Sequence, residues 1–312
     1  MAYLRLCVDS VKKYSSYDHE ILIHVNDGSD GTLEWVRSQG LKHSHTQQNI
    51  GVCLSVNHLA AQAKNEWIVY VNDDMVCCPG WDTAFINAIK SSKTDLVVFF
   101  SALIQPYDTG HPCEIVQDFG STPSDFNEFK MLANYMSVTK ADVEGQGSQP
   151  TLVLRKWWHL VGGYSLEFSP GMSSDDDLLM KFWVVGCRNF RMISLSRFYH
   201  FGSKTTHRIR RNRGGRAFVM KWGITQQEFH SRYLSKSGQP AAQKPKLEQP
   251  LVFQFPRATL LGKMKRAVYG IFRDYPLEDL EAWDMAPAQH FVTDGSDVCL
   301  EKMNGTTDIP KE

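Results

Sequence analysis

The chain has 312 residues, of which 42% are hydrophobic, enough for one large α/β domain or two smaller ones with a sizeable core. The formal net charge is zero and the pI is about 7.2, so any binding to nucleic acid or to an anionic membrane must come from local charge. The seven cysteines lack zinc-site spacing, and no apolar run reaches the roughly 18 residues of a membrane span or resembles a signal peptide, so we expect a reduced, cytoplasmic protein that could act at a membrane surface.

The first forty residues predict a helix, a strand and a second helix. Apolar residues near helical spacing predict a helix over residues 4–13, and residues 20–25 predict a strand. The polar, glycine-containing turn 26–32 follows this strand, and residues 33–39 predict a helix that Gly40 ends. This succession is the beginning of a βαβ unit.

The next segment centres on the apolar run 67–71, which ends in Asn72-Asp73-Asp74. It follows a turn at 49–51 and an amphipathic stretch over 52–64. A continuously apolar run is typical of a strand covered on both faces in a parallel sheet, and ligands bind outside the carboxyl ends of such strands. Carboxylates placed there can hold Mg²⁺ or Mn²⁺ against a phosphate. The alternative, a turn or a helix cap, is the commoner role of an Asp pair taken alone.

The remainder of the chain alternates helices and strands and then becomes polar. This alternation favours an α/β class with a parallel sheet. The helices are predicted over residues 81–90, 155–161, 177–185, 218–222, 226–234 and 263–272, and the strands over 96–100 and 191–195. Residues 105–149 indicate an irregular insertion, and the Ser-, Gly-, Gln-, Pro- and Lys-rich residues 235–250 indicate a linker.

The order of motifs resembles the family-2 inverting glycosyltransferases, enzymes of GT-A fold that use nucleotide-diphosphate sugars. The resemblance covers residues 4–235, and its strength lies in six short motifs in the right order. They are Asn26-Asp27-Gly28-Ser29, Asn49-Ile50-Gly51, Asn72-Asp73-Asp74, Gly162-Gly163-Tyr164, Ser174-Asp175-Asp176-Asp177-Leu178 and His200 within His-Phe-Gly-Ser.

The resemblance implies a nucleotide site in the first hundred residues. It places Asp27 beside the base, with Gly28 and Asn49 also binding the nucleotide, although a turn Asp that bonds its own backbone is the alternative. Asp74 would bind the metal directly, and Asp73 would contact the ribose or a water beside the metal. Asn72 stands where the family has an Asp, which removes one negative charge.

The resemblance also implies a catalytic acid cluster and a distant metal ligand. Asp175 is our choice of general base. Asp176 is the other possibility, because Ser174 replaces the usual Glu of the family motif and the motif can then be aligned with the sequence in more than one way. Capping of the following helix is the competing role for these acids. His200 would complete the metal sphere and favour Mn²⁺ over Mg²⁺, the alternative being an ordinary buried histidine.

The basic segment 207–216 contains Arg208 and Arg211, which we predict to close over the donor diphosphate. A solvated surface loop and an RNA-binding patch are the competing interpretations. The neutral net charge favours the diphosphate.

The family begins with a strand that this sequence lacks, since residue 1 falls at the following helix. A misassigned start, a fragment, or another segment in place of the strand would each account for this. Loss of a central strand would expose sheet edges.

Together these features predict a GT-A (Rossmann-like) α/β fold with a mixed, mainly parallel sheet flanked by helices. We expect a glycosyltransferase domain over 1–235, with a nucleotide-binding half (1–100) and an acceptor half (101–235), followed by a partly helical extension over 236–312. The predicted reaction moves a sugar, UDP-linked, to a glycan, lipid-linked or protein hydroxyl with inversion and a divalent metal, without nucleic acid. The rivals are a metal-dependent nucleotidyltransferase and a non-catalytic nucleotide- or glycan-binding remnant.

Overall fold

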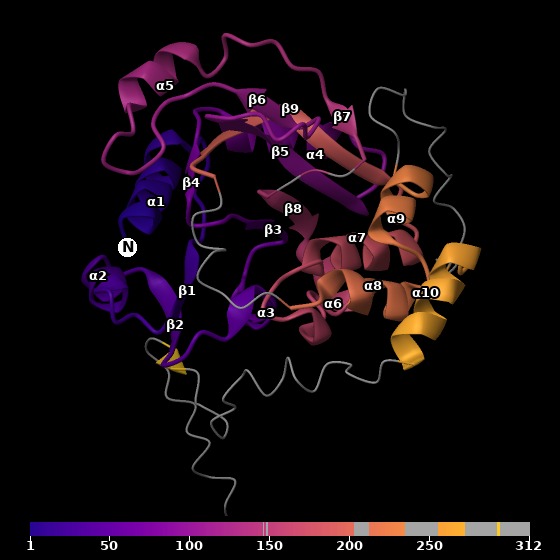
Figure 1. The fold of residues 1–312 in the computed structure, drawn as a ribbon. Helices are drawn as coiled ribbons and strands as arrows, with labels where there is room; N and C mark the ends of the chain where they lie inside the picture. The colour runs from indigo at the N-terminus through magenta and orange to yellow at the C-terminus, as the bar shows by residue number, and fades with distance from the viewer. Residues whose placement is uncertain (146, 148, 203–211, 235–254, 272–291, 294–312) are drawn as a thin grey trace, which may run out of the picture.

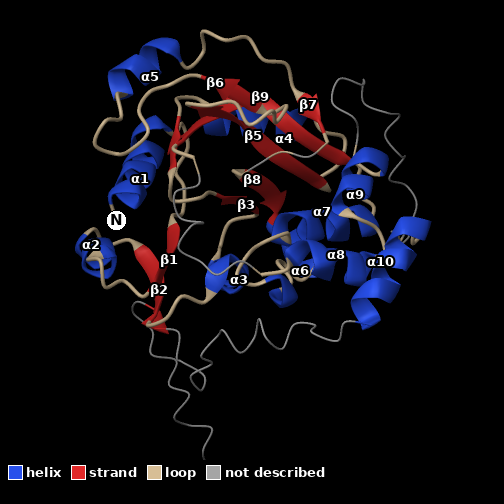
Figure 2. Ribbon diagram, in the orientation of Figure 1, coloured by secondary structure: helices blue, strands red, loops and turns tan. Residues whose placement is uncertain are grey.

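The computed structural model describes residues 1–145, 147, 149–202, 212–234, 255–271 and 292–293. Its described helices and strands are mixed along the chain, as the α/β class predicts (Figures 1 and 2). In order they are α1 Ala2–Tyr14, β1 Leu22–Asn26, α2 Thr32–Ser38, β2 Lys42–Thr46, α3 Gly51–Gln62, β3 Trp67–Tyr70, β4 Met75–Cys77, α4 Trp81–Ser91, β5 Val97–Gln105, β6 Glu114–Val116, α5 Glu128–Asn134, β7 Val143–Glu144, β8 Thr151–Leu154, α6 Arg155–Leu160, the 3₁₀ helix η1 Leu166–Phe168, α7 Ser174–Val184, β9 Asn189–His200, α8 Gly214–Trp222, α9 Gln226–Arg232, α10 Leu260–Ile271 and β10 Val292–Thr293.

The described strands form two sheets. The smaller has the order β1-β2-β10, in which β1 and β2 are parallel and β10 is antiparallel to β2. The larger has the order β3-β8-β5-β9-β4, with β6 paired to β5 and β7 to β9. Within the part of the chain that is described, β1 and β3 each have one strand neighbour and belong to different sheets.

The mixed class of sheet is confirmed, but the expected predominance of parallel pairing is not found among these strands. Only β1 with β2, β5 with β6 and β5 with β9 pair in parallel, whereas β3, β4, β7 and β8 pair antiparallel to their neighbours. The prediction rested on helix–strand alternation in the first hundred residues. The later strand β8 inserts between β3 and β5 and runs antiparallel to both, whereas β9 runs parallel to β5 and antiparallel to β4.

The strand β3 is covered on both faces, as predicted, but it lies at the end of its sheet and pairs only with β8 among the described strands. Trp67 and Val69 pack against the core layer that includes α4, and Ile68 and Tyr70 pack against the layer that includes α3. All four side chains stay half-buried. An apolar run shows that both faces are covered, but not whether a second strand lies alongside.

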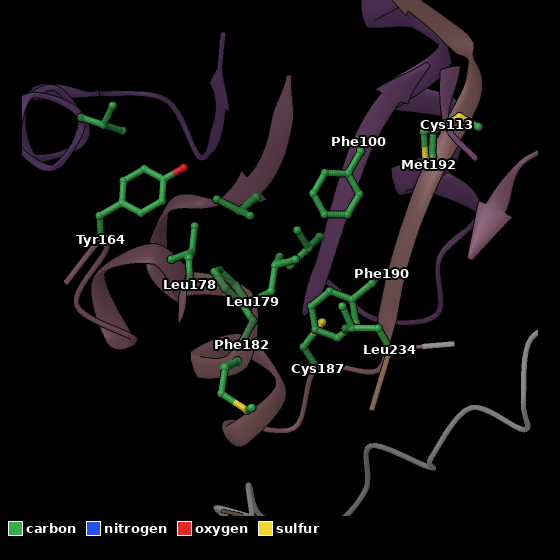
Figure 3. Close-up of a cluster of buried hydrophobic side chains, with 14 of the residues drawn as sticks. Phe100, Cys113, Tyr164, Leu178, Leu179, Phe182, Cys187, Phe190, Met192 and Leu234 are labelled. Carbon is green, nitrogen blue, oxygen red and sulfur yellow. The ribbon is translucent and has the colours of Figure 1, made fainter. Parts of the chain in front are cut away.

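The nine-residue strand β5 divides the main core into two layers because its side chains alternate. Val97, Phe99 and Leu103 face α1 and α4, and Phe100 and Ile104 face α3, α6 and α7. Figure 3 shows the second layer, where Phe100 and Phe190 of the sheet lie near Leu179 and Phe182 of α7. The smaller sheet has a core of its own with α1 and α2.

Several elements differ from the prediction in kind or extent. The insertion 105–149 contains β6, α5 and β7, the helix α7 starts at Ser174 rather than at residue 177, and β9 continues to His200 rather than ending at residue 195. The strand β2 was missed because Lys-His-Ser-His-Thr has no apolar alternation. The predicted linker 235–250 lies outside the described residues.

Candidate active site

The first half of the site joins the start of β4 to the end of β9. The antiparallel register pairs Met75 with His200, and Phe201 N donates to Asp74 O at 3.2 Å. This pairing brings the two predicted metal ligands together, with His200 Nε2 3.5 Å from Asp74 Oδ2. Both side chains are buried, Asp74 being 2% exposed.

A glutamine holds the His200 ring from the other side. His200 Nδ1 lies 3.2 Å from Gln105 Oε1, so an Nδ1–H would donate to that oxygen and leave the Nε2 lone pair facing Asp74. One carboxylate and one imidazole nitrogen side by side are a donor set that fits Mn²⁺. The described residues contain no cluster of three or more His, Cys, Asp or Glu side chains placed to hold a metal, so the protein offers a pair of ligands there.

The turn between β3 and β4 is fixed by α1. Cys7 Sγ donates to Asn72 O at 3.7 Å, and Cys77 N donates to Ser10 Oγ at 3.0 Å. The Asp73 side chain is exposed at this turn, beside the buried Asp74. The two adjacent acids therefore have different environments.

The turn after β1 presents the Asp27 carboxylate to solvent. Asp27 has a φ of +61°, and its backbone is fixed by Asp27 N donating to Thr46 O at 2.8 Å and by His45 Nε2 lying 2.8 Å from Asp27 O. Ser29 Oγ donates to Asp27 Oδ2 at 2.8 Å. A Cβ at Gly28 would lie 2.9 Å from Leu33 Cβ, so glycine is needed for this turn.

The turn before α3 connects this region to the loop before α7. Ile50 N donates to Asn26 Oδ1 at 3.0 Å, and Asn49 Oδ1 accepts from Gly51 N at 2.9 Å. A Cβ at Gly51 would meet the Pro170 backbone at 2.8 Å, and Val52 N donates to Pro170 O at 2.9 Å. The Asn49 side chain thus bonds its own turn, which lies against the loop that leads to the acid cluster.

The three acids at the start of α7 point to three different partners. Tyr164 Oη donates to Asp175 Oδ1 at 2.8 Å. Asp176 is 7% exposed and faces α9, where His230 Nε2 lies 2.5 Å from Oδ1 and Gln226 also bonds it. Asp177 is fully buried and accepts from Ser165 Oγ at 2.6 Å. Successive helical residues project about 100° apart, so only one of the three can face a given site.

The environment of Asp175 raises the pKa of its carboxyl above the ordinary value. Burial is the largest cause and the charge of Asp176 adds to it, while hydrogen bonds from Gln149 and Tyr164 act in the opposite direction. The hydroxyl of Tyr70 is within electrostatic reach of both acid groups. Burial raises the pKa of its hydroxyl well above 10, and the charges of Asp175, Asp73 and Asp74 raise it further.

Three residues near these acids were not predicted as site residues, namely Tyr70, Gln105 and Tyr164. Tyr70 and Tyr164 pack edge to face with ring centroids 6.1 Å apart, and Figure 3 shows Tyr164 beside the start of α7. The motif Gly162-Gly163-Tyr164 was the sequence signal that could have pointed to Tyr164. The structure explains the glycine before it, because a Cβ at Gly163 would lie 2.2 Å from Asn57 Oδ1. Nothing in the sequence points to Gln105.

The predicted diphosphate ligands Arg208 and Arg211 lie outside the described residues. Two later arginines of the basic segment are described. Arg213 is exposed at the start of α8, and Arg216 Nη2 donates to Tyr269 O of α10 at 2.9 Å.

Comparison with known families gives one match. Residues 1–110 match the model of glycosyl transferase family 2, a stretch that contains the turn after β1, the turn before α3 and Asp73-Asp74. This part of the chain belongs to glycosyl transferase family 2. No curated protein sequence matches the chain.

The chain has a GT-A fold, which it shares with solved structures. Residues 1–349 of S. aureus TarS superpose with a TM-score of 0.50 at 13% identity, covering 72% of this chain and 62% of that one. A structure of GalNAc-T7 with UDP, GalNAc and Mn²⁺ has a TM-score of 0.47 at 16% identity, covering 68% and 41%. The chain thus spans less than two thirds of the length of either.

Proposed function

We propose that this family 2 chain transfers a sugar from a nucleotide-diphosphate donor to a hydroxyl acceptor with inversion. The observation that carries the proposal is the hydrogen bond from Tyr164 Oη to the half-buried Asp175, whose pKa is raised by desolvation. A carboxylate with a raised pKa is a stronger base at neutral pH than an ordinary Asp. It lies near Tyr70, whose hydroxyl also senses the charges of Asp73 and Asp74.

In this mechanism Asp175 accepts the proton of the acceptor hydroxyl. The acceptor oxygen attacks the anomeric carbon from the side opposite the leaving group. The bond between that carbon and the diphosphate breaks, and its electron pair leaves with the nucleotide diphosphate. A base on the acceptor side and a leaving group on the other give inversion at that carbon.

Asp74 and His200 would hold the divalent cation, with Gln105 orienting the imidazole. When bound, Mn²⁺ or Mg²⁺ supplies positive charge that stabilises the departing diphosphate. Asp27, Gly28, Asn49 and Asp73 are our nucleotide-binding residues. Arg208 and Arg211 stay our prediction for the diphosphate.

We further propose that residues 1–100 bind the donor, together with the metal ligand His200, and that residues 101–235 bind the acceptor. Residues 236–312 then form a C-terminal extension of this domain. We propose a UDP-linked donor, a hexose as the transferred sugar, and a glycan, lipid-linked or protein hydroxyl as acceptor, in polysaccharide biosynthesis. TarS has been crystallised with UDP-GlcNAc. Six described cysteines are buried free thiols, which supports a cytoplasmic location.

The decisive experiment compares Asp175→Asn with the intact chain. With UDP-sugars and Mn²⁺, we expect the variant to lose transfer by about a thousandfold, because the base is gone, while donor affinity measured by calorimetry changes little. The matched control is Asp95→Asn, which removes a partly exposed carboxylate that bonds Lys156. Full turnover in Asp175→Asn would refute this base, and pyrophosphate exchange without sugar release would favour a nucleotidyltransferase.

A further inference from the structure

The helix α10 packs on the protein through its small and polar side. Gly262 is buried against Gly223, since a Cβ there would lie 1.8 Å from Gly223 O. Arg266 donates to Val219 O at 3.1 Å and to Lys221 O at 3.0 Å. Arg216 donates to Tyr269 O. Because later residues of α10 contact earlier residues of α8, the two helices are antiparallel.

The opposite side of α10 is apolar and faces outward, where Figure 1 shows the helix at the edge of the molecule beside α8. Leu260, Met264, Val268 and Ile271 recur at helical spacing and are 76%, 60%, 50% and 76% exposed. Leu261 is exposed on the same side, at 47%. A soluble-domain helix normally has the reverse arrangement, with the apolar stripe against the core.

Positive charge borders this apolar face. On a helix with 100° per residue, Lys263 and Lys265 lie one on each side of Met264, about 100° away. No Asp or Glu occurs between Phe255 and Ile271, and the exposed Arg257 before the helix adds further positive charge. Lysines at the borders of an apolar stripe can keep their ammonium groups at a lipid headgroup layer while their methylene stems lie along the apolar surface.

We propose that α10 binds the surface of an anionic membrane, with its outward apolar face in the headgroup and acyl boundary and its lysines on acidic lipid headgroups. We choose an anionic membrane as the occupant because the two flanking lysines, with no Asp or Glu in residues 255–271, complement anionic lipids, while the nearest acid of α9, Glu228, accepts from Thr259 before the helix begins. No described helix is long and apolar enough to cross a bilayer, so the contact is one of surface binding.

The position of α10 relates the membrane to the acid cluster. Its Tyr269 end lies at Arg216 near the start of α8, and a Cβ at Gly214 would lie 2.1 Å from Met172 O, just before α7. The bilayer would therefore adjoin the segment that carries Asp175. The idea that this closeness would bring a lipid-linked acceptor to Asp175 rests on the proposed function. The proposal that α10 binds a membrane does not depend on it.

The test is flotation of the full chain with vesicles of equal parts phosphatidylglycerol and phosphatidylcholine, and with phosphatidylcholine alone. We expect flotation with the anionic vesicles that weakens with added salt. The double variant Met264→Ser, Val268→Ser should reduce the bound fraction by about tenfold. The double variant Lys263→Gln, Lys265→Gln should reduce it on anionic vesicles only.

The matched control is Phe129→Ser, which removes an 83% exposed apolar side chain on α5 and should float like the intact chain. Failure of the intact chain to float, or equal flotation of the Met264 and Val268 variant, overturns the proposal. A dimer seen by light scattering that this variant dissociates, without flotation of the intact chain, overturns it in favour of a protein interface. None of these measurements requires a sugar donor, so they are independent of the transferase assay.

Discussion

At the scale of single residues, the three consecutive acids of α7 have separate environments. Asp175 bonds Tyr164, Asp176 bonds His230 and Gln226 of α9, and Asp177 is fully buried. Asp177 accepts from Trp222 Nε1 at 2.9 Å, which ties α7 to α8. We therefore keep Asp175 as the proposed base and give Asp176 the positioning role of holding α9 against α7.

The bond from Tyr164 gives a testable pH dependence. It stabilises the charged form of Asp175 and so lowers a pKa that burial has raised. In Tyr164→Phe the pKa of Asp175 should rise further, because a hydrogen bond to its charged form is lost. The base then loses its proton at higher pH, so the acidic limb of kcat/KM against pH should move to higher pH.

The phenylalanine retains the ring that packs on Trp158 and Tyr70, so the change is confined to the hydroxyl. Tyr14→Phe is the matched control, because it removes a tyrosine–carboxylate bond to Glu128 away from the site. An acidic limb that stays in place in Tyr164→Phe would show that Asp175 does not titrate in the reaction.

At the scale of elements, a bulge in β9 decides which face His200 occupies. Ser101 pairs with Ile193 but Ala102 pairs with Arg197, so three extra residues leave the ladder. An odd number of extra residues turns the rest of the strand over. Accordingly Phe190 and Met192 face the layer of α7, whereas Phe198 faces the layer of α4 and Tyr199 faces α7.

The buried guanidinium of Arg197 fixes this bulge. It is 1% exposed and donates to Ser194 O at 3.0 Å, to Val138 O at 2.9 Å and to Tyr135 O. Arg197→Met keeps most of the side-chain volume but leaves three carbonyl oxygens without their donor. We expect a loss of about 3 kcal/mol in the free energy of unfolding, measured with urea.

Arg232→Met is the control for Arg197→Met. Arg232 is 60% exposed and lies 3.9 Å from Glu228 on the same helix, so its removal should change stability by less than about 0.5 kcal/mol. Equal losses in the two variants would mean that the buried bonds of Arg197 do not stabilise the bulge.

At the scale of the whole molecule, the proposed donor site joins the two sheets. Asp27 follows β1 of the smaller sheet, while Asp74 and His200 belong to the larger one. A ligand that contacts both should stabilise the folded chain as a unit. At a concentration about 100 times its Kd, it adds about 2.7 kcal/mol.

We therefore expect UDP with Mn²⁺ to raise the Tm by about 5 °C in a thermal melt. The rise should disappear when the metal is chelated, and in Asp74→Asn, which removes one proposed metal ligand. A rise that is the same with and without the metal would exclude Asp74 and His200 as a metal site that the nucleotide requires.

The sequence by itself determined most of the helices, the longer apolar strands and the resemblance to the family, but it missed α5, β4 and β8. The strands at residues 67–71 and 96–100 can be predicted from their local pattern of apolar residues. Motifs such as Asn72-Asp73-Asp74 can be recognised because they are short and contiguous in the sequence. The strand β2 was missed because its five residues are polar, and β9 was predicted to end at residue 195 because the bulge there breaks the alternation.

Only the tertiary structure decided which residues meet. Asp74 lies beside His200 because β4 pairs with β9 in one register, a contact between distant segments that no local pattern encodes. Asp175 is set apart from Asp176 because Tyr164 and α9 approach α7 from different sides. The outward turn of the apolar face of α10 was equally invisible in the sequence, since periodicity reveals that a helix has an apolar side but not what that side faces.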